Sequence, residues 1–229
     1  MPSKFYSPDA QRARQVNKLF ATIARRYDLL NDIMSGGLHR RWKNRLVELA
    51  GQPRDVLDLC CGTGDIALRF QGQVVGADFT VEMLRVAQAR STAVNWLQAD
   101  ALRLPFADHS FDVVTVGYGL RNLADLPAGL REIYRVLRPG GRLLSLDFGK
   151  PENRLWRAIY FGYLRTALPV LGWLYCGDPD THGYILVSLQ NYGAQRGVQE
   201  LMNQCGYRDC SFEEALGGIM AINFGTKPG

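Results

Sequence analysis

Acidic side chains and a glycine-rich turn mark the points where three apolar segments of this sequence end. An apolar run that contains Asp58 leads into a turn with Gly62 and Gly64. Asp78 ends a second apolar run, and Asp100 follows a third. The carboxyl ends of parallel strands meet at one edge of a sheet, where α/β folds bind nucleotide-type cofactors, so we expect these groups to surround one cofactor.

The charges around the turn favour one class of cofactor. Asp58 precedes the turn and Asp65 follows it, and two carboxylates there repel a pyrophosphate but attract a cation. Ala67 stands where the dinucleotide fingerprint has its third glycine, a variant that the fingerprint tolerates. S-adenosylmethionine carries a sulfonium and an ammonium group and no phosphate. The pattern therefore predicts this cofactor, with Asp78 accepting from its ribose hydroxyls and Asp100 from its adenine amino group.

Each acid also has a simpler interpretation. Asp65 can be the N-terminal charge of a helix expected over residues 65–70, worth about 0.3–1 kcal/mol. Asp78 can begin a turn before a helix capped by Thr80. The prediction of a cofactor site rests on the whole set of acids, each at a strand-to-helix junction.

Length and composition suit one α/β domain with additional elements. The chain has 229 residues, of which 47% are hydrophobic and 21% charged, values that are typical of globular proteins. Its five cysteines have no CxxC spacing, so we expect reduced thiols in a cytoplasmic protein, and neither a metal site nor a disulfide framework.

The net charge of +5 is concentrated in the first part of the chain. Residues 1–45 contain ten Lys and Arg against three Asp. Such a segment can contact RNA or anionic lipid, or form a solvated helix face. Residues 1–10 have no apolar centre, so no secretory signal is expected.

An apolar segment of 21 residues, Leu155–Tyr175, contains Arg157, Arg165 and the helix breaker Pro169. Inserting two arginines at mid-bilayer costs about 2.5–3.5 kcal/mol each. Burial of the eight Leu, Ile, Val and Phe side chains contributes only about 0.3–0.6 kcal/mol each, which does not offset that cost. We expect helices that touch a bilayer or an apolar substrate without spanning the membrane.

The elements that position the acids alternate between strand and helix patterns from Asp55 onward, which predicts an α/β fold with a parallel sheet covered on both faces. Strands are expected over 74–78, 94–99, 111–117 and 142–148, and helices over 65–70, 81–90, 123–137 and 194–204. Strands over 207–215 and 218–226 are joined too tightly for a parallel crossover, so they should form an antiparallel hairpin at the sheet edge. Within this single domain, two helices in residues 1–50 should cap the cofactor side, and residues 150–192 form an apolar insertion over the substrate.

Polar residues recur every four positions near the N-terminus. Tyr27, Asn31, Ser35 and His39 share one helix face until Gly36-Gly37 interrupts the helix. Such a stripe can line a pocket, and the simpler alternative is a helix cap with a hydrogen-bonded histidine.

Two segments resemble the signatures of the ubiquinone and menaquinone biosynthesis C-methyltransferases. These are Tyr27–Trp42 and Tyr134–Asp147, and the similarity extends from about Val16 to the Gly-Gly-Ile-Met-Ala-Ile run near the C-terminus. The resemblance implies the class I, Rossmann-like methyltransferase fold, with a seven-stranded, mostly parallel sheet. It also implies S-adenosylmethionine-dependent methylation of a ring carbon of a prenylated quinol.

The same resemblance assigns roles to individual residues. It implies that Thr63 and Asp78 contact the cofactor, that Asp100 and Ala101 lie at the adenine, and that Gly117 is nearby. With Asp58, Gly62 and Gly64 from the turn, these are the expected cofactor-binding residues.

Arg121 and Asn122 match the family's motif beside the reacting ring. Arg121 would stabilise the ionised ring oxygen, with Asn122 orienting it, and His39 is the second candidate for the base because an imidazole titrates near neutrality. The alternative for Arg121 is a surface ion pair with Asp125. The residues expected to line the substrate pocket are Tyr27, Asn31, Met34, Tyr118, Tyr184 and Ser188.

Several positions depart from the pattern of the bacterial enzymes. Examples are Leu30, Gly36, Asp147 and Asn223-Phe224. Together with Gly177–Tyr184, these departures are more similar to the branch of oxygenic phototrophs that methylates 2-phytyl-1,4-naphthoquinol to form phylloquinone. That is the predicted reaction, and a demethylmenaquinol or a ubiquinone precursor is the alternative acceptor.

The predicted substrate is insoluble in water, so we expect peripheral contact with an anionic membrane through residues 155–175 and the basic N-terminal helices. An RNA methyltransferase is a weaker interpretation, because Gly117-Tyr118-Gly119-Leu120 replaces an Asn-Pro-Pro-Tyr motif after the fourth strand and no RNA-binding module is present. No nucleic-acid partner is expected. A nucleotide-dependent reductase and a non-catalytic partner are further alternatives, and the oligomeric state is open between monomer and homodimer.

Overall fold

The computed structural model describes Phe5 and residues 11–229. Apart from Phe5, the first ten residues, for which no secretory signal is expected, lie outside the described part. Seven strands form one sheet in the order β3-β2-β1-β4-β5-β7-β6. The strands are β1 (Asp55–Leu59), β2 (Gln73–Asp78), β3 (Asn95–Gln98), β4 (Phe111–Gly117), β5 (Leu137–Phe148), β6 (Arg208–Ala215) and β7 (Met220–Thr226). β1 to β5 pair in parallel, whereas β7 is antiparallel to β5 and β6. The predicted fold class and the antiparallel hairpin at the sheet edge are confirmed.

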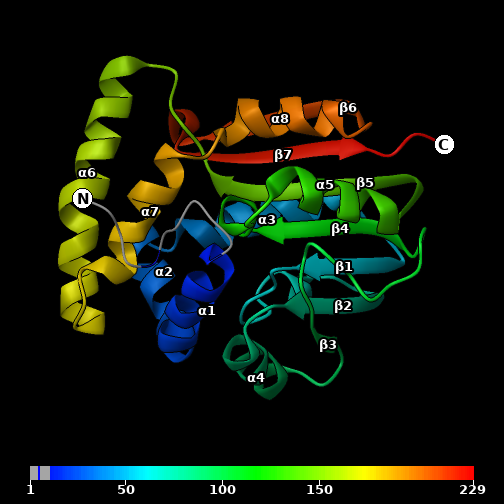
Figure 1. The fold of residues 1–229 in the computed structure, drawn as a ribbon, viewed down its shortest axis with the longest axis horizontal. Coiled ribbons are helices and arrows are strands. Elements are labelled where there is room, and N and C mark those ends of the chain that lie inside the picture. The colour runs from blue at the N-terminus through cyan, green and yellow to red at the C-terminus, as the bar shows by residue number, and fades with distance from the viewer. Residues whose placement is uncertain (1–4, 6–10) are drawn as a thin grey trace.

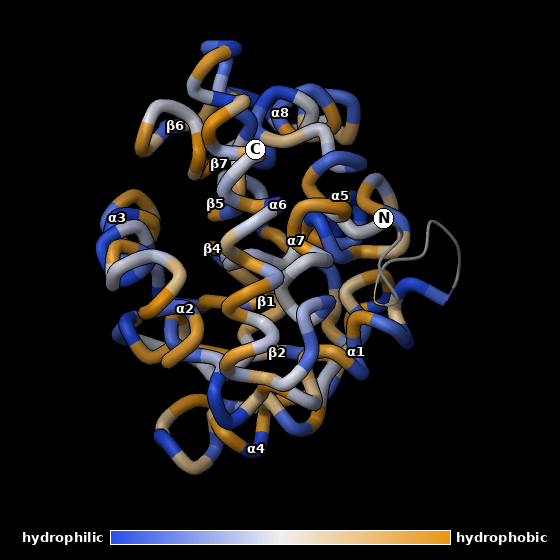
Figure 2. Tube along the Cα trace, turned by 90° about the vertical axis from the view of Figure 1, so that its left-hand side faces the viewer, coloured by the Kyte–Doolittle hydropathy of each residue, from blue (hydrophilic) through white to orange (hydrophobic). Residues whose placement is uncertain are grey.

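Eight α-helices surround the sheet in the described part of the chain. They are α1 (Arg12–Ile23), α2 (Tyr27–Ser35), α3 (Leu38–Ala50), α4 (Val81–Arg90), α5 (Leu126–Val136), α6 (Arg154–Cys176), α7 (Asp180–Gln190) and α8 (Ala194–Gln204). Figure 2 looks along the sheet, with α3 on one side and α5 on the other. Figure 1 shows α1, α2, α6 and α7 together beyond the carboxyl ends of the parallel strands. The helices of the N-terminal segment and of the insertion therefore meet at the edge where a cofactor is expected.

The central strands are apolar because both of their faces are covered, as in other parallel sheets. Val56 and Leu57 of β1, Val114 of β4 and Leu143 and Leu144 of β5 are fully buried. Burial of these side chains fixes the strands against each other, and with them the positions of the residues at the strand ends.

The prediction of a helix over residues 65–70 is wrong. A series of turns follows β1 and leads only into the short 3-10 helix η2 (Ala67–Arg69). One reason is that the Asp58 carboxylate accepts the backbone N–H of Ala67 at 3.0 Å, which takes the place of a helical hydrogen bond. The described part of residues 1–50 contains three α-helices where two are expected, because Gly36 and Gly37 both adopt positive φ and end α2.

The other predicted elements are present with shifts of at most three residues at their ends, except that β5 begins at Leu137, five residues before the strand expected over 142–148. Helix α5 begins at Leu126, after Asp125 caps it by accepting the N–H of Ala128 at 2.9 Å. The apolar insertion forms α6 and α7, and α6 continues through Pro169. In the described part of the chain, no helix is both long and apolar enough to cross a bilayer.

Candidate active site

The first of two adjoining pockets lies where β1, β2 and β4 end, and it encloses about 840 Å³ including its mouth. Asp78 forms part of its floor and joins two strands. One of its carboxylate oxygens accepts the N–H of Gly62 at 2.8 Å, and the other accepts the N–H of Thr80 at 2.8 Å. Burial raises the pKa of Asp78, and the hydrogen bonds from Thr80 and Gly62 oppose that rise. This carboxylate therefore holds the turn after β1 against the end of β2.

Two residues at the strand ends adopt a backbone conformation that side chains rarely take. Cys60 after β1 has φ 56° and Tyr118 after β4 has φ 60°, and both line the first pocket. Non-glycine residues in the left-handed region cost about 1–3 kcal/mol and concentrate at ligand sites. This strain supports a binding role for the crevice.

Asp58 lies beneath the first pocket and does not line it. Its side chain is fully buried, and Thr115, its register partner on β4, donates its hydroxyl to it at 2.7 Å. Burial raises the pKa of Asp58 to about 7. Asp58 instead lines a smaller pocket that shares Gly62 and Gly117 with the first, and its contact with the cofactor stays a prediction.

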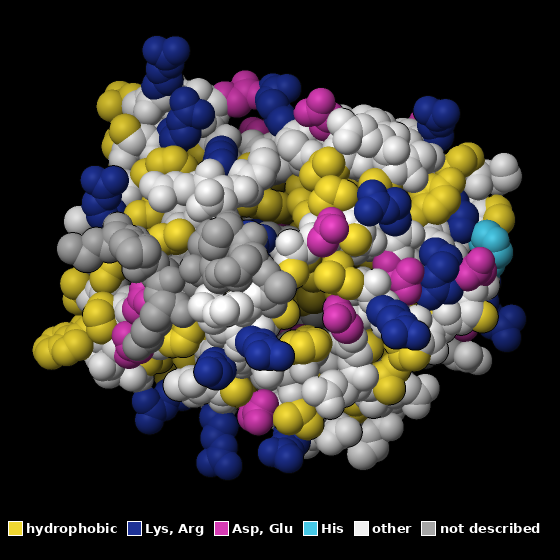
Figure 3. All heavy atoms as spheres, viewed as in Figure 1, with side chains coloured by type: hydrophobic (Ala, Val, Ile, Leu, Met, Phe, Trp, Pro, Cys, Tyr) yellow, Lys and Arg dark blue, Asp and Glu magenta, His cyan; other side chains and the backbone are white. Residues whose placement is uncertain are grey.

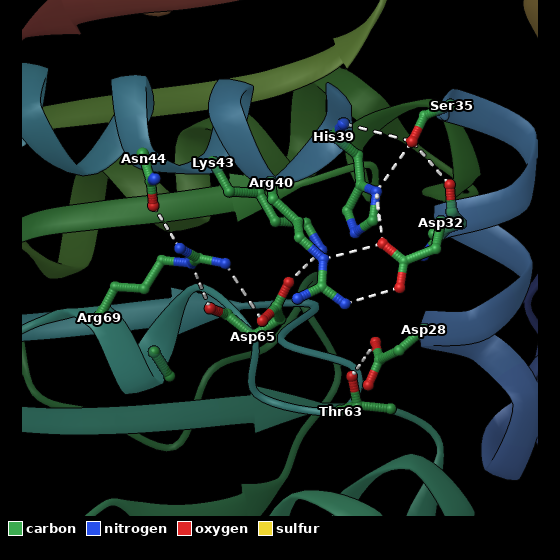
Figure 4. Close-up of polar contacts among 12 residues, drawn as sticks. Asp28, Asp32, Ser35, His39, Arg40, Lys43, Asn44, Thr63, Asp65 and Arg69 are labelled. Carbon is green, nitrogen blue, oxygen red and sulfur yellow. Dashed lines mark hydrogen bonds and ion pairs between the residues drawn. The ribbon is translucent and has the colours of Figure 1, made fainter. Parts of the chain in front are cut away.

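Asp65 also faces away from the first pocket, toward a cluster of cations (Figure 4). Lys43 Nζ lies 2.7 Å from its carboxylate, and Arg69 and Arg90 lie at 3.4 and 3.5 Å. The two acids around the turn are thus neutralised or buried, so they give little support to the part of the charge argument that rests on them. Asp78 and Asp100 remain to carry it.

Replacing Lys43 with Met is expected to lower stability in a pH-dependent way. Burial by itself raises the pKa of Asp65, but Lys43 and the neighbouring arginines outweigh this and lower the pKa to about 2. A carboxyl with a lowered pKa contributes stability above its unfolded value near 3.8, and that contribution, about 2 kcal/mol here, is lost as the pH falls toward 2. We expect K43M to unfold at lower urea concentration than wild type at pH 7, with a much smaller difference at pH 2.5.

The exposed Lys18 on α1 offers a control for this experiment. Lys18→Met should leave the unfolding midpoint within about 0.5 kcal/mol of wild type at both pH values. An equal destabilisation by K43M at pH 7 and pH 2.5 would show that Lys43 acts through packing alone.

Thr63 and Gly64 hold the shape of the turn. The Thr63 hydroxyl donates to Asp28 of α2 at 2.8 Å (Figure 4). Gly64 has φ +82°, and a Cβ there would lie 2.3 Å from the Trp96 ring, which covers this glycine. Neither residue lines the first pocket, although Thr63 lines the smaller pocket that adjoins it, and both position the turn.

Gly64→Ala is expected to destabilise the fold by more than the backbone strain alone. The added methyl group must displace the Trp96 ring, and overpacking costs about 1–3 kcal/mol beyond the penalty for a positive φ. Gly177 is a matched control, because its φ is +69° and a Cβ there meets nothing within 4 Å. Thermal unfolding of G64A and G177A should differ by several degrees, and equal midpoints would contradict the role of Trp96.

The remaining expected cofactor residues line the first pocket. Gly117 lies at the end of β4, and the buried Ala101 follows β3. Asp100 is exposed at the rim, where one carboxylate oxygen accepts the N–H of Leu102 at 2.9 Å. Its other oxygen has no hydrogen bond within the described chain and is available to a ligand.

Helix α1 contributes residues that the sequence reasoning missed. Ala13, Val16, Asn17 and Phe20 line the first pocket, and their spacing of three and four is the signal that could have found them. Buried amide oxygens of Asn17 and Asn122 line the same pocket and have no hydrogen-bond donor within the described chain. Unused buried acceptors suit a ligand that carries N–H groups.

The second pocket is mostly apolar and aromatic and encloses about 1060 Å³ including its mouth. Phe20, Tyr27 and Tyr118 line both pockets, so ligands in the two would lie side by side. The predicted substrate residues that line the second pocket are Tyr27, Asn31, Met34, Tyr118 and Tyr184. Ser188 is buried outside it and donates to the Ile185 carbonyl at 3.0 Å.

Arg121, on the short helix η3 (Leu120–Asn122), is the buried cation of the second pocket. It is paired with Asp147 and donates to the Tyr118 carbonyl at 2.8 Å and to the Tyr184 hydroxyl at 3.3 Å. Burial by itself lowers the pKa of Arg121, but Asp147 outweighs this and raises the pKa above its ordinary value. The alternative ion pair with Asp125 is absent from these contacts, because Asp125 caps α5. Arg121 is therefore a permanent, oriented charge.

His39 lies at the start of α3 and also lines the second pocket. Its Nδ1 is 2.9 Å from the Ser35 hydroxyl and 3.7 Å from Asp32 (Figure 4). Burial and Lys43 lower the pKa of His39, so the ring is neutral at pH 7. Both His39 and Ser35 line the second pocket, whereas Asn122 lies in the first and donates to the Tyr118 carbonyl at 3.2 Å.

Residues 8–227 match the family model described as the ubiE/COQ5 methyltransferase family. A relative named ubiquinone/menaquinone biosynthesis C-methyltransferase UbiE from Azotobacter vinelandii is 40% identical over 235 residues, which cover 96% of this chain and 93% of the relative. The protein of the same name from Teredinibacter turnerae is 40% identical over 232 residues, 95% of this chain and 93% of its own length.

Solved structures share the fold at lower identity. A methyltransferase of Thermotoga maritima that depends on S-adenosylmethionine superposes with a TM-score of 0.63 at 19% identity, covering 91% of this chain and 99% of its own. A phosphoethanolamine N-methyltransferase of Haemonchus contortus in complex with S-adenosyl-L-methionine gives 0.61 at 17% identity, covering 82% and 53%. These likenesses support the class I methyltransferase fold.

Proposed function

Since the chain belongs to the ubiE/COQ5 methyltransferase family, and is thus an S-adenosyl-L-methionine-dependent C-methyltransferase of quinone biosynthesis, we propose that its acceptor is a prenylated naphthoquinol. The first candidate is 2-phytyl-1,4-naphthoquinol. The observation that carries the proposal is the apolar second pocket, which shares a wall with the first pocket and contains one oriented buried cation, Arg121. An apolar ring with an ionisable oxygen fits such a pocket.

The first pocket fits the cofactor through acceptors that are otherwise unused. Asp78 and Asp100 would accept from the ribose hydroxyls and the adenine amino group, and Gly62, Ala101 and Gly117 allow close approach. The buried amide oxygens of Asn17 and Asn122 suit the donors of an ammonium group. When bound, the cofactor supplies a methyl group on a positively charged sulfur.

The residues of the second pocket would prepare the acceptor for attack. An ionised quinol oxygen increases the electron density on the adjacent ring carbon, and the Arg121 guanidinium stabilises that oxygen. His39, neutral at pH 7 and lining the same pocket, is the candidate that takes the proton. Tyr27, Asn31 and Met34 of α2 would hold the ring against the shared wall. Alignment of the reacting ring carbon with the methyl group is a large part of the rate enhancement.

A single assay tests the proposed acceptor. Radiolabelled methyl transfer is measured to reduced 2-phytyl-1,4-naphthoquinol, a demethylmenaquinol and a demethylated ubiquinol precursor side by side. We expect the highest kcat/KM with the phytyl substrate, and a clear preference for another ring would refute this assignment. Calorimetry with S-adenosylhomocysteine, NADH and a short RNA tests the cofactor class in parallel, with binding expected for the first only.

The second candidate acceptor is a demethylmenaquinol or a ubiquinone precursor. It is favoured by the sequence identity of 40% to relatives named ubiquinone/menaquinone biosynthesis C-methyltransferase over nearly the whole chain. The departures at Leu30, Asp147 and Asn223-Phe224 favour the phylloquinone branch instead.

We further propose that the enzyme reaches its substrate at an anionic membrane, with the helices of residues 1–50 capping the cofactor and residues 150–192 covering the acceptor. Helix α6 exposes a row of apolar side chains, of which Leu155 is 72% and Trp173 62% exposed. Figure 3 shows apolar side chains protruding where α6 lies in Figure 1. Leu38, Tyr163 and Leu216 are exposed and also line the second pocket, so the pocket opens among apolar surface residues.

A basic groove adjoins this apolar row and favours an anionic surface as its partner. It lies between η1 (Ala24–Arg26), α4 and the end of α6, and includes Arg25, Arg26 and Arg85 against one acid, Glu82. In the described chain, Arg25 and Arg85 have no ion pair, and Arg26 donates to the Tyr175 carbonyl at 2.7 Å. Cations beside exposed Trp173 suit the boundary between lipid headgroups and acyl chains.

Vesicle flotation tests the docking surface. Wild type should bind vesicles that contain phosphatidylglycerol and bind neutral phosphatidylcholine vesicles much less. Arg85→Glu changes two charges, worth about 1 kcal/mol each near an anionic surface, and should reduce partitioning about 30-fold. Arg208→Glu, at the start of β6, is the control and should bind like wild type. Equal binding to both kinds of vesicle would remove the electrostatic part of the proposal.

A further inference from the structure

One buried polar group of the second pocket has no role in the fold. Two tyrosines there have hydrogen-bonded hydroxyls: the Tyr184 hydroxyl accepts from Arg121 at 3.3 Å, and the Tyr163 hydroxyl donates to the Met34 carbonyl at 3.2 Å. Tyr160, on α6, is only 4% exposed, lines the same pocket, and its hydroxyl has no hydrogen-bond partner within the described chain.

A buried hydroxyl without a partner is unfavourable in a folded protein. The Tyr160 ring packs beside Phe161, with centroids 5.7 Å apart, and a phenylalanine would make the same apolar contacts. Packing therefore explains the ring but leaves the hydroxyl unexplained. A group of this kind at the wall of a pocket is accounted for when a ligand completes its hydrogen bond.

A second unused group in the same pocket indicates what the ligand offers. Arg121 Nε is buried and has no acceptor within the described chain, and a guanidinium can only donate. A tyrosine hydroxyl can donate or accept, and Tyr160 stays protonated at neutral pH because burial raises its pKa. The two residues come from different elements, η3 and α6, and both line the second pocket, so we look for one ligand that offers an oxygen to each.

We propose that the Tyr160 hydroxyl binds the second ring oxygen of the acceptor, at the end of the ring opposite the oxygen that faces Arg121. Tyr160 is then a specificity-determining residue that selects a 1,4-dioxygenated ring over a ring with one oxygen. This inference rests on the proposed function, since it takes a quinol as the acceptor. The discrimination follows from the loss of a buried hydrogen bond when the second oxygen is absent.

The test pairs a change in the protein with a change in the substrate. Tyr160→Phe and wild type are compared on a short-chain 2-prenyl-1,4-naphthoquinol and on 3-prenyl-1-naphthol, which keeps only the hydroxyl next to the reacting carbon. We expect Y160F to lower kcat/KM for the quinol about tenfold, mainly through KM, and to leave kcat/KM for the naphthol within twofold. Wild type should prefer the quinol, and Y160F should lose most of that preference.

Binding and stability provide readouts that do not depend on turnover. Trp42 is one of the four tryptophans and lines the same pocket, so quenching of the tryptophan fluorescence gives the dissociation constants of both ring compounds. Y160F should weaken only the binding of the quinol, about tenfold. The melting temperature of Y160F without ligand should be at least that of wild type, because the variant loses an unpartnered buried hydroxyl.

Tyr163→Phe is the matched control. It removes a hydroxyl on the same helix that is already bonded to a carbonyl, and it should not change the preference between the two compounds. An equal effect of Y160F on both compounds, or no effect on either, would overturn the proposal. If wild type methylated neither compound, the proposed function would fail, and the ratio of the two dissociation constants would still decide the role of Tyr160.

Discussion

Arg121→Gln is expected to lower kcat about 10²- to 10³-fold while leaving the dissociation constant of S-adenosylhomocysteine within about twofold of wild type. The guanidinium faces the second pocket and is held by Asp147, Tyr118 and Tyr184. Removal of one oriented donor from a developing oxyanion costs rates of this size. Single-turnover methyl transfer and calorimetry measure the two quantities separately.

The ion pair of Arg121 complicates the single variant, because it leaves Asp147 buried without its partner. Breaking a buried pair on one side destabilises a fold by about 3–5 kcal/mol. The double variant Arg121→Gln/Asp147→Asn removes both charges and should recover most of the melting temperature but none of the turnover. Recovery of activity in the double variant, or equal losses in turnover and cofactor affinity, would contradict the role of Arg121.

Asp78→Asn is expected to raise the dissociation constant of S-adenosylhomocysteine about 10- to 100-fold. The two carboxylate oxygens accept N–H groups from Gly62 and Thr80, and an Asn side chain can accept through only one of its two terminal atoms. The variant loses both the charged acceptor proposed for the ribose and one support of the turn. Hydrogen bonds to charged groups contribute about 1.5–3 kcal/mol, which corresponds to this range of affinity.

Asp112 offers a control with the same chemistry at the other end of the sheet. Its carboxylate accepts the N–H groups of Asp55 at 3.0 Å and Arg54 at 3.2 Å, away from both pockets. Asp112→Asn should lower stability without changing cofactor affinity. If Asp78→Asn bound the cofactor as tightly as wild type, the assignment of the first pocket would fall.

Much of the fold could be predicted from local signals. The spacing of apolar residues identified the strands β2 and β4 and the helices α4 and α8 within one or two residues, because this spacing reports directly on burial. The short connection between β6 and β7 identified the antiparallel hairpin. The helix after β1 could not be predicted correctly, since the side chain that replaces its hydrogen bond, Asp58, is nine residues away in the sequence.

The candidate site was harder to predict where it depends on tertiary contacts. The sequence shows the charge of Asp65 but not that Lys43, 22 positions earlier, neutralises it. Equally, nothing local indicates that Tyr160 is left without a partner while Tyr163, three residues on, has one. Such facts follow from how helices dock, which pattern reasoning does not resolve.

The shared wall between the two pockets has a consequence for the catalytic cycle. Tyr27 begins α2 and lines both pockets, and Asn31, Met34 and Ser35 of the same helix line the second. With the cofactor in the first pocket and the acceptor in the second, as proposed, a displacement of α2 that released the methylated ring would also open the pocket of the spent cofactor. Departure of the two products is then kinetically linked, and a tightly held lipid product would slow cofactor exchange as well.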